Sequence, residues 1–158
     1  MTGRKFPRGA GFDFAGTVAQ AASDVTGLAA GDEVWGFLDG AQGGGPTGTA
    51  AEYVLAPAQG TSLRPRTVSA VDAAALSGVG ASALGVLQDA IRLRPGERVL
   101  VPGANGGVGT AAGQVARALG GRVTALASPP HLDACATWAP SRPSTTTPPT
   151  SAAWGGST

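Results

Sequence analysis

The segment 98–127 constrains the fold of this chain most strongly. Residues 98–102 form a short apolar run with the length and β-branching of a buried parallel strand. A glycine-rich loop over 103–109 follows, then small residues over 107–119 that predict a helix, and a second strand-like run over 122–127. Strand, glycine loop, helix and strand in this order make a βαβ unit, the smallest half of a dinucleotide-binding fold.

The glycine loop predicts a phosphate-binding turn. Gly103 and Gly106 let the chain turn and let a pyrophosphate approach the backbone, and Gly109 lets the helix pack on the strand. N–H groups at the start of the helix then face the phosphates. The spacing Gly-x-x-Gly-Gly-x-Gly differs from the commoner Gly-x-Gly-x-x-Gly, and the alternative is an ordinary tight turn in a chain with 26 glycines. The flanking elements favour a cofactor, and the expected contacts are Gly103, Ala104, Asn105, Gly106, Gly107, Val108 and Gly109.

The residue after the second strand indicates which cofactor the loop would hold. Sites that select NAD usually place Asp or Glu there to bind the ribose 2′-hydroxyl, and this chain has Ser128. A neutral residue does not repel a 2′-phosphate, so we expect NADPH to be preferred over NADH. His131 is a further candidate for contacting that phosphate when it is protonated, and a solvent-exposed turn histidine is the alternative interpretation.

The residues before this unit predict a β region and then helices. Residues 11–20 alternate larger and smaller side chains as a strand does, and the segments 33–38 and 51–56 read as two further strands, the last one ended by a proline. Residues 71–76 and 81–91 are rich in Ala and Leu at helical spacing. A Pro-Gly turn then leads into the βαβ unit.

Residues 136–158 differ in kind from the rest of the chain. They contain no acidic residue and no Val, Leu, Ile or Phe, and Thr, Ser and Pro dominate. Trp138 and Trp154 have no apolar partners at helical or strand spacing. We therefore expect this tail to be disordered.

Charge and composition exclude several classes of function. The 11 basic and 10 acidic residues give a net charge of +1 and are scattered, so nothing predicts binding of nucleic acid or of an anionic membrane. Glycine or proline interrupts every longer apolar stretch, so we expect a soluble cytoplasmic protein without a membrane segment. His131 and Cys135 are the chain's single His and Cys, too few for the common zinc sites, and we expect no metal.

Five blocks of sequence, taken in order, resemble the zeta-crystallin-like quinone oxidoreductases of the medium-chain dehydrogenase/reductase superfamily. The blocks are Gly11-Phe12-Asp13-Phe14-Ala15-Gly16-Thr17-Val18, Ala30-Gly31-Asp32-Glu33-Val34, Gly48-Thr49-Ala50-Ala51-Glu52-Tyr53, Pro95-Gly96-Glu97-Arg98-Val99-Leu100-Val101, and the glycine loop with Gln114 and Ala116. The resemblance implies an α/β fold in which a partial GroES-like β domain with linking helices (1–90) leads into the first βαβ half of a Rossmann fold (91–135), followed by the disordered tail (136–158).

The resemblance also implies a zinc-free chemistry. Zinc alcohol dehydrogenases of the superfamily carry Gly-His-Glu in the first block, where this chain has Gly11-Phe12-Asp13. In the zinc-free branch a Thr near the nicotinamide matches Ser82 here, and a helix-packing residue is the alternative reading of Ser82. We read Tyr53 as a strand-packing residue rather than a proton donor, and Cys135 as an inert thiol at the edge of the tail.

The resemblance predicts an NADPH-dependent oxidoreductase that transfers hydride to a quinone or an α,β-unsaturated carbonyl, as relatives that form homodimers do. Relatives extend beyond both ends of this match, so we expect a truncated form, with an unpaired apolar sheet edge and a reading-frame shift near residue 135 as the hypothesis for the tail. The alternatives are a catalytically inactive nucleotide-binding remnant or fold fragment, and, with less support, a glycine-rich interaction domain.

Overall fold

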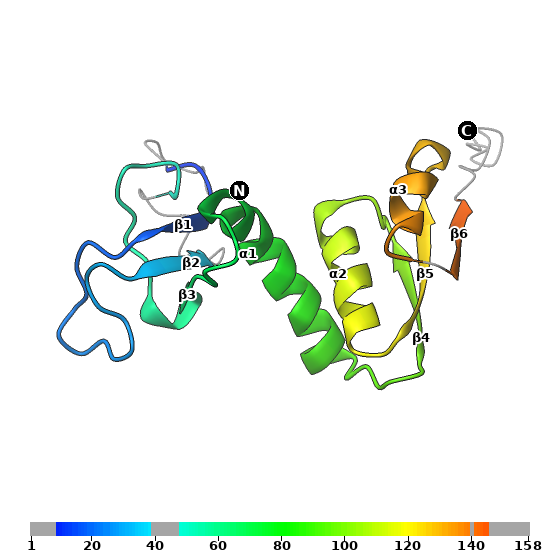
Figure 1. Ribbon diagram of the computed structural model, residues 1–158, viewed down its shortest axis with the longest axis horizontal. Helices are drawn as coiled ribbons and strands as arrows, with labels where there is room; N and C mark the ends of the chain where they lie inside the picture. The colour runs from blue at the N-terminus through cyan, green and yellow to red at the C-terminus, as the bar shows by residue number, and fades with distance from the viewer. Residues whose placement is uncertain (1–8, 39–47, 140, 146–158) are drawn as a thin grey trace, which may run out of the picture. The chain divides into compact units, whose positions relative to one another are not determined.

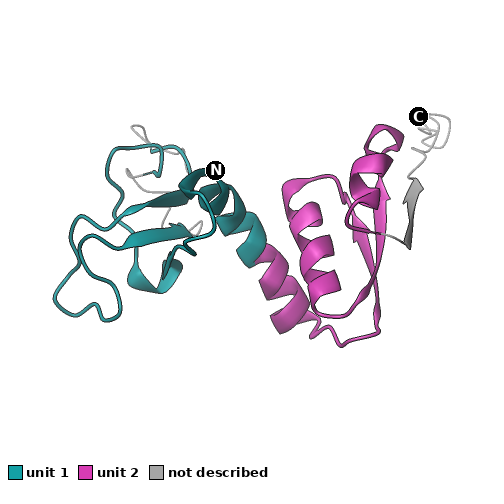
Figure 2. Ribbon diagram, viewed as in Figure 1, with its two compact units in different colours: residues 1–81 teal, residues 82–158 magenta. Residues whose placement is uncertain are grey.

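The computed structural model describes residues 9–38, 48–139 and 141–145. The chain divides into two compact units, Met1–Ala81 and Ser82–Thr158 (Figure 2). The division falls inside a helix, somewhat before the domain boundary that we placed after residue 90. Each unit has its own sheet, antiparallel in the first and parallel in the second.

The sheet of the first unit has three strands in the order β1-β2-β3 (Figure 1). Strand β1 (Asp13–Thr17) pairs with β2 (Glu33–Phe37), and β2 pairs with β3 (Thr61–Leu63), which follows a short 3-10 turn, η1 (Ala58–Gly60). The first two strands confirm the predictions for 11–20 and 33–38, although β1 is shorter than expected.

The third strand predicted for this unit, over 51–56, is wrong. These residues form no strand, and Tyr53 and Leu55 are 76% and 84% exposed. Both edges of β2 are already occupied, by β1 and by β3. Alternation along a sequence signals a strand-like period, but a strand also needs a backbone partner, and for this segment the sheet supplies none. Tyr53 is therefore not a strand-packing residue either.

The two predicted helical stretches form one continuous helix. Helix α1 (Ala70–Leu84) runs into a π-helical segment, η2 (Gly85–Ala90). The Ser69 hydroxyl accepts the Asp72 N–H at 3.1 Å and so caps the start of α1. A carboxylate oxygen of Asp13, on β1, accepts the hydroxyl of buried Ser77 and the N–H of Gly78, both at 2.7 Å. These bonds hold the middle of α1 against the sheet, so glycine there does not end the helix.

The helix from Ala70 to Ala90 is long and apolar enough to cross a membrane, by its 21 residues and a mean hydropathy of 1.6. Length and composition alone are weak support for a membrane span, because core helices of globular proteins share them. The absence of a membrane segment therefore stays a prediction.

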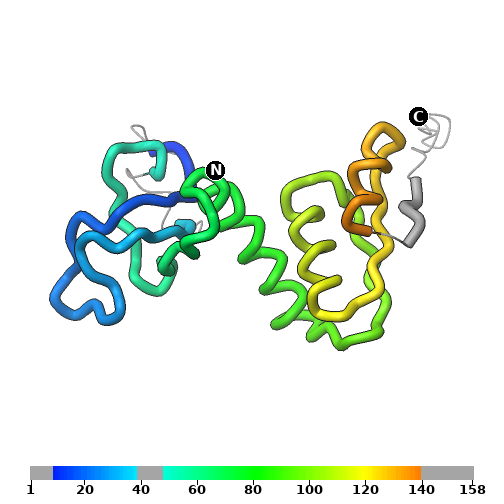
Figure 3. Tube along the Cα trace, viewed as in Figure 1, coloured from blue at the N-terminus to red at the C-terminus, as the bar shows by residue number. Residues whose placement is uncertain are grey.

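The second unit contains the βαβ unit as the sequence predicts it (Figures 1 and 3). Strand β4 (Arg98–Pro102) leads through the glycine loop into α2 (Gly107–Ala118), which returns the chain to β5 (Arg122–Ala127). The two strands are parallel, with Arg98 opposite Arg122. Gly120 ends α2 in the left-handed region at φ 83°, as expected of a glycine stop.

The core of this unit lies between α2 and one face of the sheet. Its buried members are Leu87, Val101, Ala104, Ala116, Val123, Ala125, Ala127, Cys135 and Ala139. Half of them are alanines or other small residues, so helix and strands approach closely. Cys135 is a core residue of this unit rather than a thiol at the edge of a disordered tail.

The tail begins as an ordered continuation of the second unit, which corrects part of the expected disorder. A short turn, η3 (Pro129–His131), leads to α3 (Leu132–Ala136) and then to β6 (Ser141–Thr145), which pairs in parallel with β5. Residues 140 and 146–158, including Trp154, lie outside the described residues.

The residue that anchors the tail is Trp138. A Cβ built on Gly113 in α2 would lie 1.9 Å from its ring, so the ring rests on the bare helix backbone. Arg117 Nη1 donates to the Trp138 carbonyl at 2.9 Å. We missed this contact because a glycine leaves no apolar mark at helical spacing in the sequence.

Gly113→Ala is expected to lower the free energy of unfolding by about 1–3 kcal/mol, because the added methyl group overlaps the Trp138 ring. The matched control is Gly80→Ala in α1, where a Cβ meets nothing within 4 Å and better helix propensity raises stability by about 0.5–1 kcal/mol. Urea unfolding followed by circular dichroism measures both. Equal stabilisation by the two substitutions would contradict the packing of Trp138 on α2.

Candidate functional site

The candidate site lies at the carboxyl edge of the parallel sheet, where β4 and β5 end. Pro102 is opposite Leu126 in the register, and the Ala104 N–H donates to the Leu126 carbonyl at 3.1 Å. The glycine loop after β4 and the segment after β5 therefore start side by side. The carboxyl edge is where ligands bind in open parallel sheets.

Two glycines of the loop are required by its geometry. Gly103 has a φ of +64°, in the left-handed region that a side chain disfavours. A Cβ on Gly109 would lie 2.3 Å from the Gly103 carbonyl oxygen and 2.9 Å from the Ala104 Cα. The first turn of α2 thus packs directly on the loop backbone, the close approach expected of Gly109. The Thr110 hydroxyl adds a bond to the Ala104 carbonyl at 3.0 Å.

The first turn of α2 presents backbone N–H groups to solvent. Gly106 is the residue before the helix, and no side chain caps it. Residues 105–108 are exposed. The first N–H groups of a helix have no partner inside it, and they carry the positive end of the helix dipole. The arrangement can bind an anion such as a phosphate group.

Ser128 and His131 lie beside this loop in the fold. Ser128 directly follows β5 and is exposed, and its carbonyl accepts the His131 N–H at 3.0 Å across η3. His131 is exposed as well. The structure thus brings the loop and both of these residues to one edge of the sheet.

Ser82 lies on α1 rather than on the elements of this edge. Its side chain is exposed, and it takes part in an interaction of its own. Its predicted place near a nicotinamide stays a prediction.

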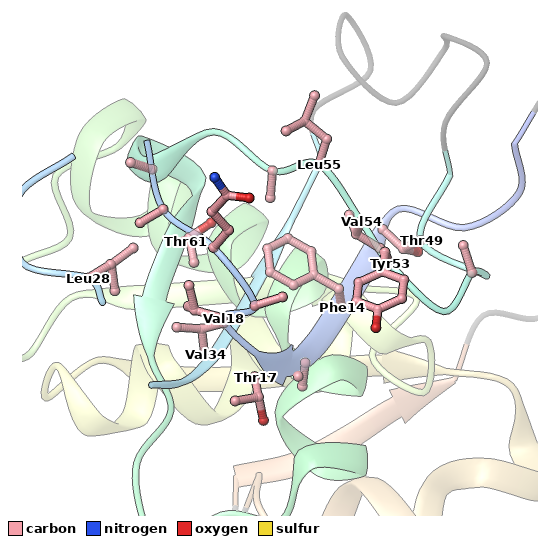
Figure 4. A pocket seen from close by; sticks show the side chains of 18 of the residues that line it. Phe14, Thr17, Val18, Leu28, Val34, Thr49, Tyr53, Val54, Leu55 and Thr61 are labelled. Atoms are coloured by element: carbon pink, nitrogen blue, oxygen red, sulfur yellow. The ribbon is translucent and has the colours of Figure 1, made fainter. Parts of the chain in front are cut away.

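A second hollow, of about 800 Å³, lies in the first unit, and the sequence analysis did not predict it (Figure 4). Residues of β1 line one side of it, and the segment that we took for a third strand lines the other. Labelled lining residues include Phe14, Val18, Val34, Tyr53 and Leu55. No motif marks such a hollow, because it depends on which segments fail to pair.

Metal ligands do not gather in the described part of the chain. Across residues 9–38, 48–139 and 141–145, no three His, Cys, Asp or Glu side chains lie close enough together to hold a metal ion.

Comparison with known proteins identifies the chain's relatives. Residues 1–66 match the family model described as the alcohol dehydrogenase GroES-like domain. A zinc-type alcohol dehydrogenase-like protein of Schizosaccharomyces pombe is 34% identical over 131 residues, covering 83% of this chain and 38% of that protein. The chain belongs to the alcohol dehydrogenase-like family. The mitochondrial NAD(P)H oxidoreductase RTN4IP1 of Bos taurus is 38% identical over 134 residues, covering 81% of this chain and 32% of that protein.

Solved structures of the alcohol dehydrogenase-like family share the fold. An alcohol dehydrogenase superfamily protein from Novosphingobium aromaticivorans superposes with a TM-score of 0.77 at 34% identity, over 85% of this chain and 40% of that one. The quinone oxidoreductase from Coxiella burnetii gives a TM-score of 0.75 at 29% identity, over 90% of this chain and 43% of that one. This chain therefore spans about two fifths or less of the length of these relatives, and its likeness to quinone oxidoreductases is confirmed.

Gly109→Ala is expected to destabilise the second unit more than Gly103→Ala. The first substitution forces a methyl group into backbone atoms and costs about 1–3 kcal/mol. The second meets nothing within 4 Å and adds only the strain of a positive φ, about 1 kcal/mol. Urea unfolding of both variants measures the difference. The reverse order would show that α2 does not pack on the loop as described.

Proposed function

We propose that this chain is the cofactor-binding part of an NADPH-dependent oxidoreductase that reduces a quinone or an α,β-unsaturated carbonyl without zinc. The observation that carries the proposal is the glycine loop at the carboxyl edge of β4, with the uncapped start of α2 behind it. Membership of an oxidoreductase family supports it, as do relatives named as NAD(P)H and quinone oxidoreductases.

The loop fits the pyrophosphate of a dinucleotide. Gly103 and Gly109 keep the turn tight, so that the exposed residues 105–108 can meet the phosphates with their main chain. Since no side chain occupies the cap position at Gly106, an incoming phosphate oxygen can take the place that a capping side chain fills in other helices.

Ser128 supports NADPH as the cofactor. An acidic residue at this position would repel a 2′-phosphate, whereas the exposed serine leaves room for it. His131, three residues on, lies at the same edge and can donate to that phosphate when it is protonated. NADPH supplies a hydride, and the protein has to orient the nicotinamide against the acceptor.

The length of the chain favours a second candidate function. The chain spans 38% of the S. pombe relative, so the other residues that surround a nicotinamide and a substrate are not all present here. A nucleotide-binding module without turnover of its own fits this observation, because orientation of both reactants is most of what the protein contributes.

The chain is expected to bind NADPH, and Gly106→Asp is expected to weaken that binding at least tenfold, or about 1.4 kcal/mol. The new carboxylate would cap α2 and repel the phosphates. Titration followed by NADPH fluorescence measures the affinity, with Gly80→Ala as the matched control remote from the loop. Equal binding by the Gly106→Asp variant would exclude the loop as the phosphate site.

Turnover distinguishes the two candidate functions once binding is established. The full chain is incubated with NADPH and either a benzoquinone or an enone, and NADPH consumption is followed by absorbance. Consumption supports the oxidoreductase, and binding without consumption supports the nucleotide-binding module. A chain that binds no dinucleotide would refute both.

Ser128→Asp is expected to reverse the cofactor preference. The carboxylate repels the 2′-phosphate and accepts the ribose 2′-hydroxyl, so NADPH binding falls about tenfold while NADH binding is kept or improved. Ser128→Ala is the control, because it removes the hydroxyl without adding charge. An unchanged ratio of the two affinities in the Ser128→Asp variant would place the ribose elsewhere.

A further inference from the structure

Strand β4 has a free edge in the described part of the chain. The sheet order is β4-β5-β6, so β4 is bonded to one neighbouring strand among the described residues. A free edge carries unpaired backbone N–H and C=O groups that can pair with another strand. This edge lies in the half of the molecule that carries the glycine loop, but it is not part of the candidate site.

The hydrogen bonds show which residues of β4 face outward. The Glu97 carbonyl accepts the Arg122 N–H at 2.7 Å, so the backbone groups of Glu97 point toward β5. These groups alternate sides along a strand. Val99 and Val101 therefore face β5 as well, and Arg98, Leu100 and Pro102 direct their backbone groups to the free edge.

Proline fits this assignment. Pro102 has no N–H to donate, and proline in a sheet belongs where the missing N–H would face away from the neighbouring strand. The free edge thus offers two donors, from Arg98 and Leu100, and three acceptors, from Arg98, Leu100 and Pro102. The central residue is Leu100, whose side chain is 59% exposed. A charged side chain at the centre of an edge commonly prevents pairing, and β4 has none there.

We propose that β4 of a second copy of this chain pairs antiparallel with this edge around a two-fold axis at Leu100. The two Leu100 residues then exchange both of their N–H to C=O bonds, and each Arg98 N–H donates to the Pro102 carbonyl of the other copy. The two parallel sheets join into one sheet across the axis. The Leu100 side chains lie next to each other on the face opposite the Val101 side.

Charge favours this antiparallel register over the parallel one. In the two-fold arrangement each Arg98 lies opposite Pro102 of the second copy, so the guanidinium groups are at opposite ends of the pair. In parallel pairing Arg98 would lie beside Arg98, a like-charge neighbour that destabilises a sheet. The other outer strand, β6, is a poorer partner, because Pro143 lacks an N–H at its centre and its register with β5 is irregular.

The sharpest test is a disulfide across the axis. Opposed residues that exchange both bonds have Cα atoms about 5.5 Å apart, within the reach of a disulfide. Leu100→Cys in a Cys135→Ala background is expected to form a covalent dimer under mild oxidation. Leu126→Cys in the same background is the control, because β5 of the two copies lies three strand spacings apart, roughly 14 Å, too far for a disulfide.

The oligomeric state of the full chain completes the test. Sedimentation velocity is expected to show a monomer–dimer equilibrium, and Leu100→Lys is expected to raise its dissociation constant at least tenfold with an unchanged circular dichroism spectrum. A monomer at all concentrations overturns the proposal. So does a dimer that Leu100→Lys leaves intact, a polymer in place of a dimer, or crosslinking of the Leu126→Cys control as fast as of Leu100→Cys.

Discussion

The contact between Gly109 and the backbone of the loop before it is the constraint on which the second unit depends. Because a Cβ there would meet the Gly103 carbonyl oxygen at 2.3 Å, α2 can begin directly on top of the turn that ends β4. The close start sets the helix near enough to the sheet for alanines to fill the core. It also points the first N–H groups of α2 at the edge where β5 ends, which makes this edge fit an anion.

The sequence predicts this βαβ unit well because its signals are local. The strand bounds Arg98–Pro102 and Arg122–Ala127 follow from short apolar runs, and the glycines mark both ends of α2. The candidate site is equally local, since the loop and Ser128 directly follow two strands that pair in parallel. Their gathering at one edge therefore requires no long-range information beyond the pairing itself.

What the sequence analysis missed depends on partners far along the chain. Strand β3 was assigned to residues 51–56, because their alternation resembles a strand more than that of Thr61–Leu63 does, yet β2 pairs with the latter. Trp138 was left without a partner because its partner is a glycine. The single helix over α1 and η2 was divided at its glycines, although a carboxylate from β1 bonds to the helix there. In each case a tertiary contact decided the outcome against the local pattern.

The way in which the tail joins the second unit bears on how freely its sequence can vary. Arg117 bonds to the main-chain carbonyl of Trp138, and β6 joins β5 through backbone pairing. Such bonds are offered by any residue other than, for the N–H, proline. One aromatic ring over Gly113 is the side-chain-specific part of the attachment. A third strand held in this way tolerates a change of nearly every letter in its sequence, which is how a segment of Thr, Ser and Pro can extend a parallel sheet.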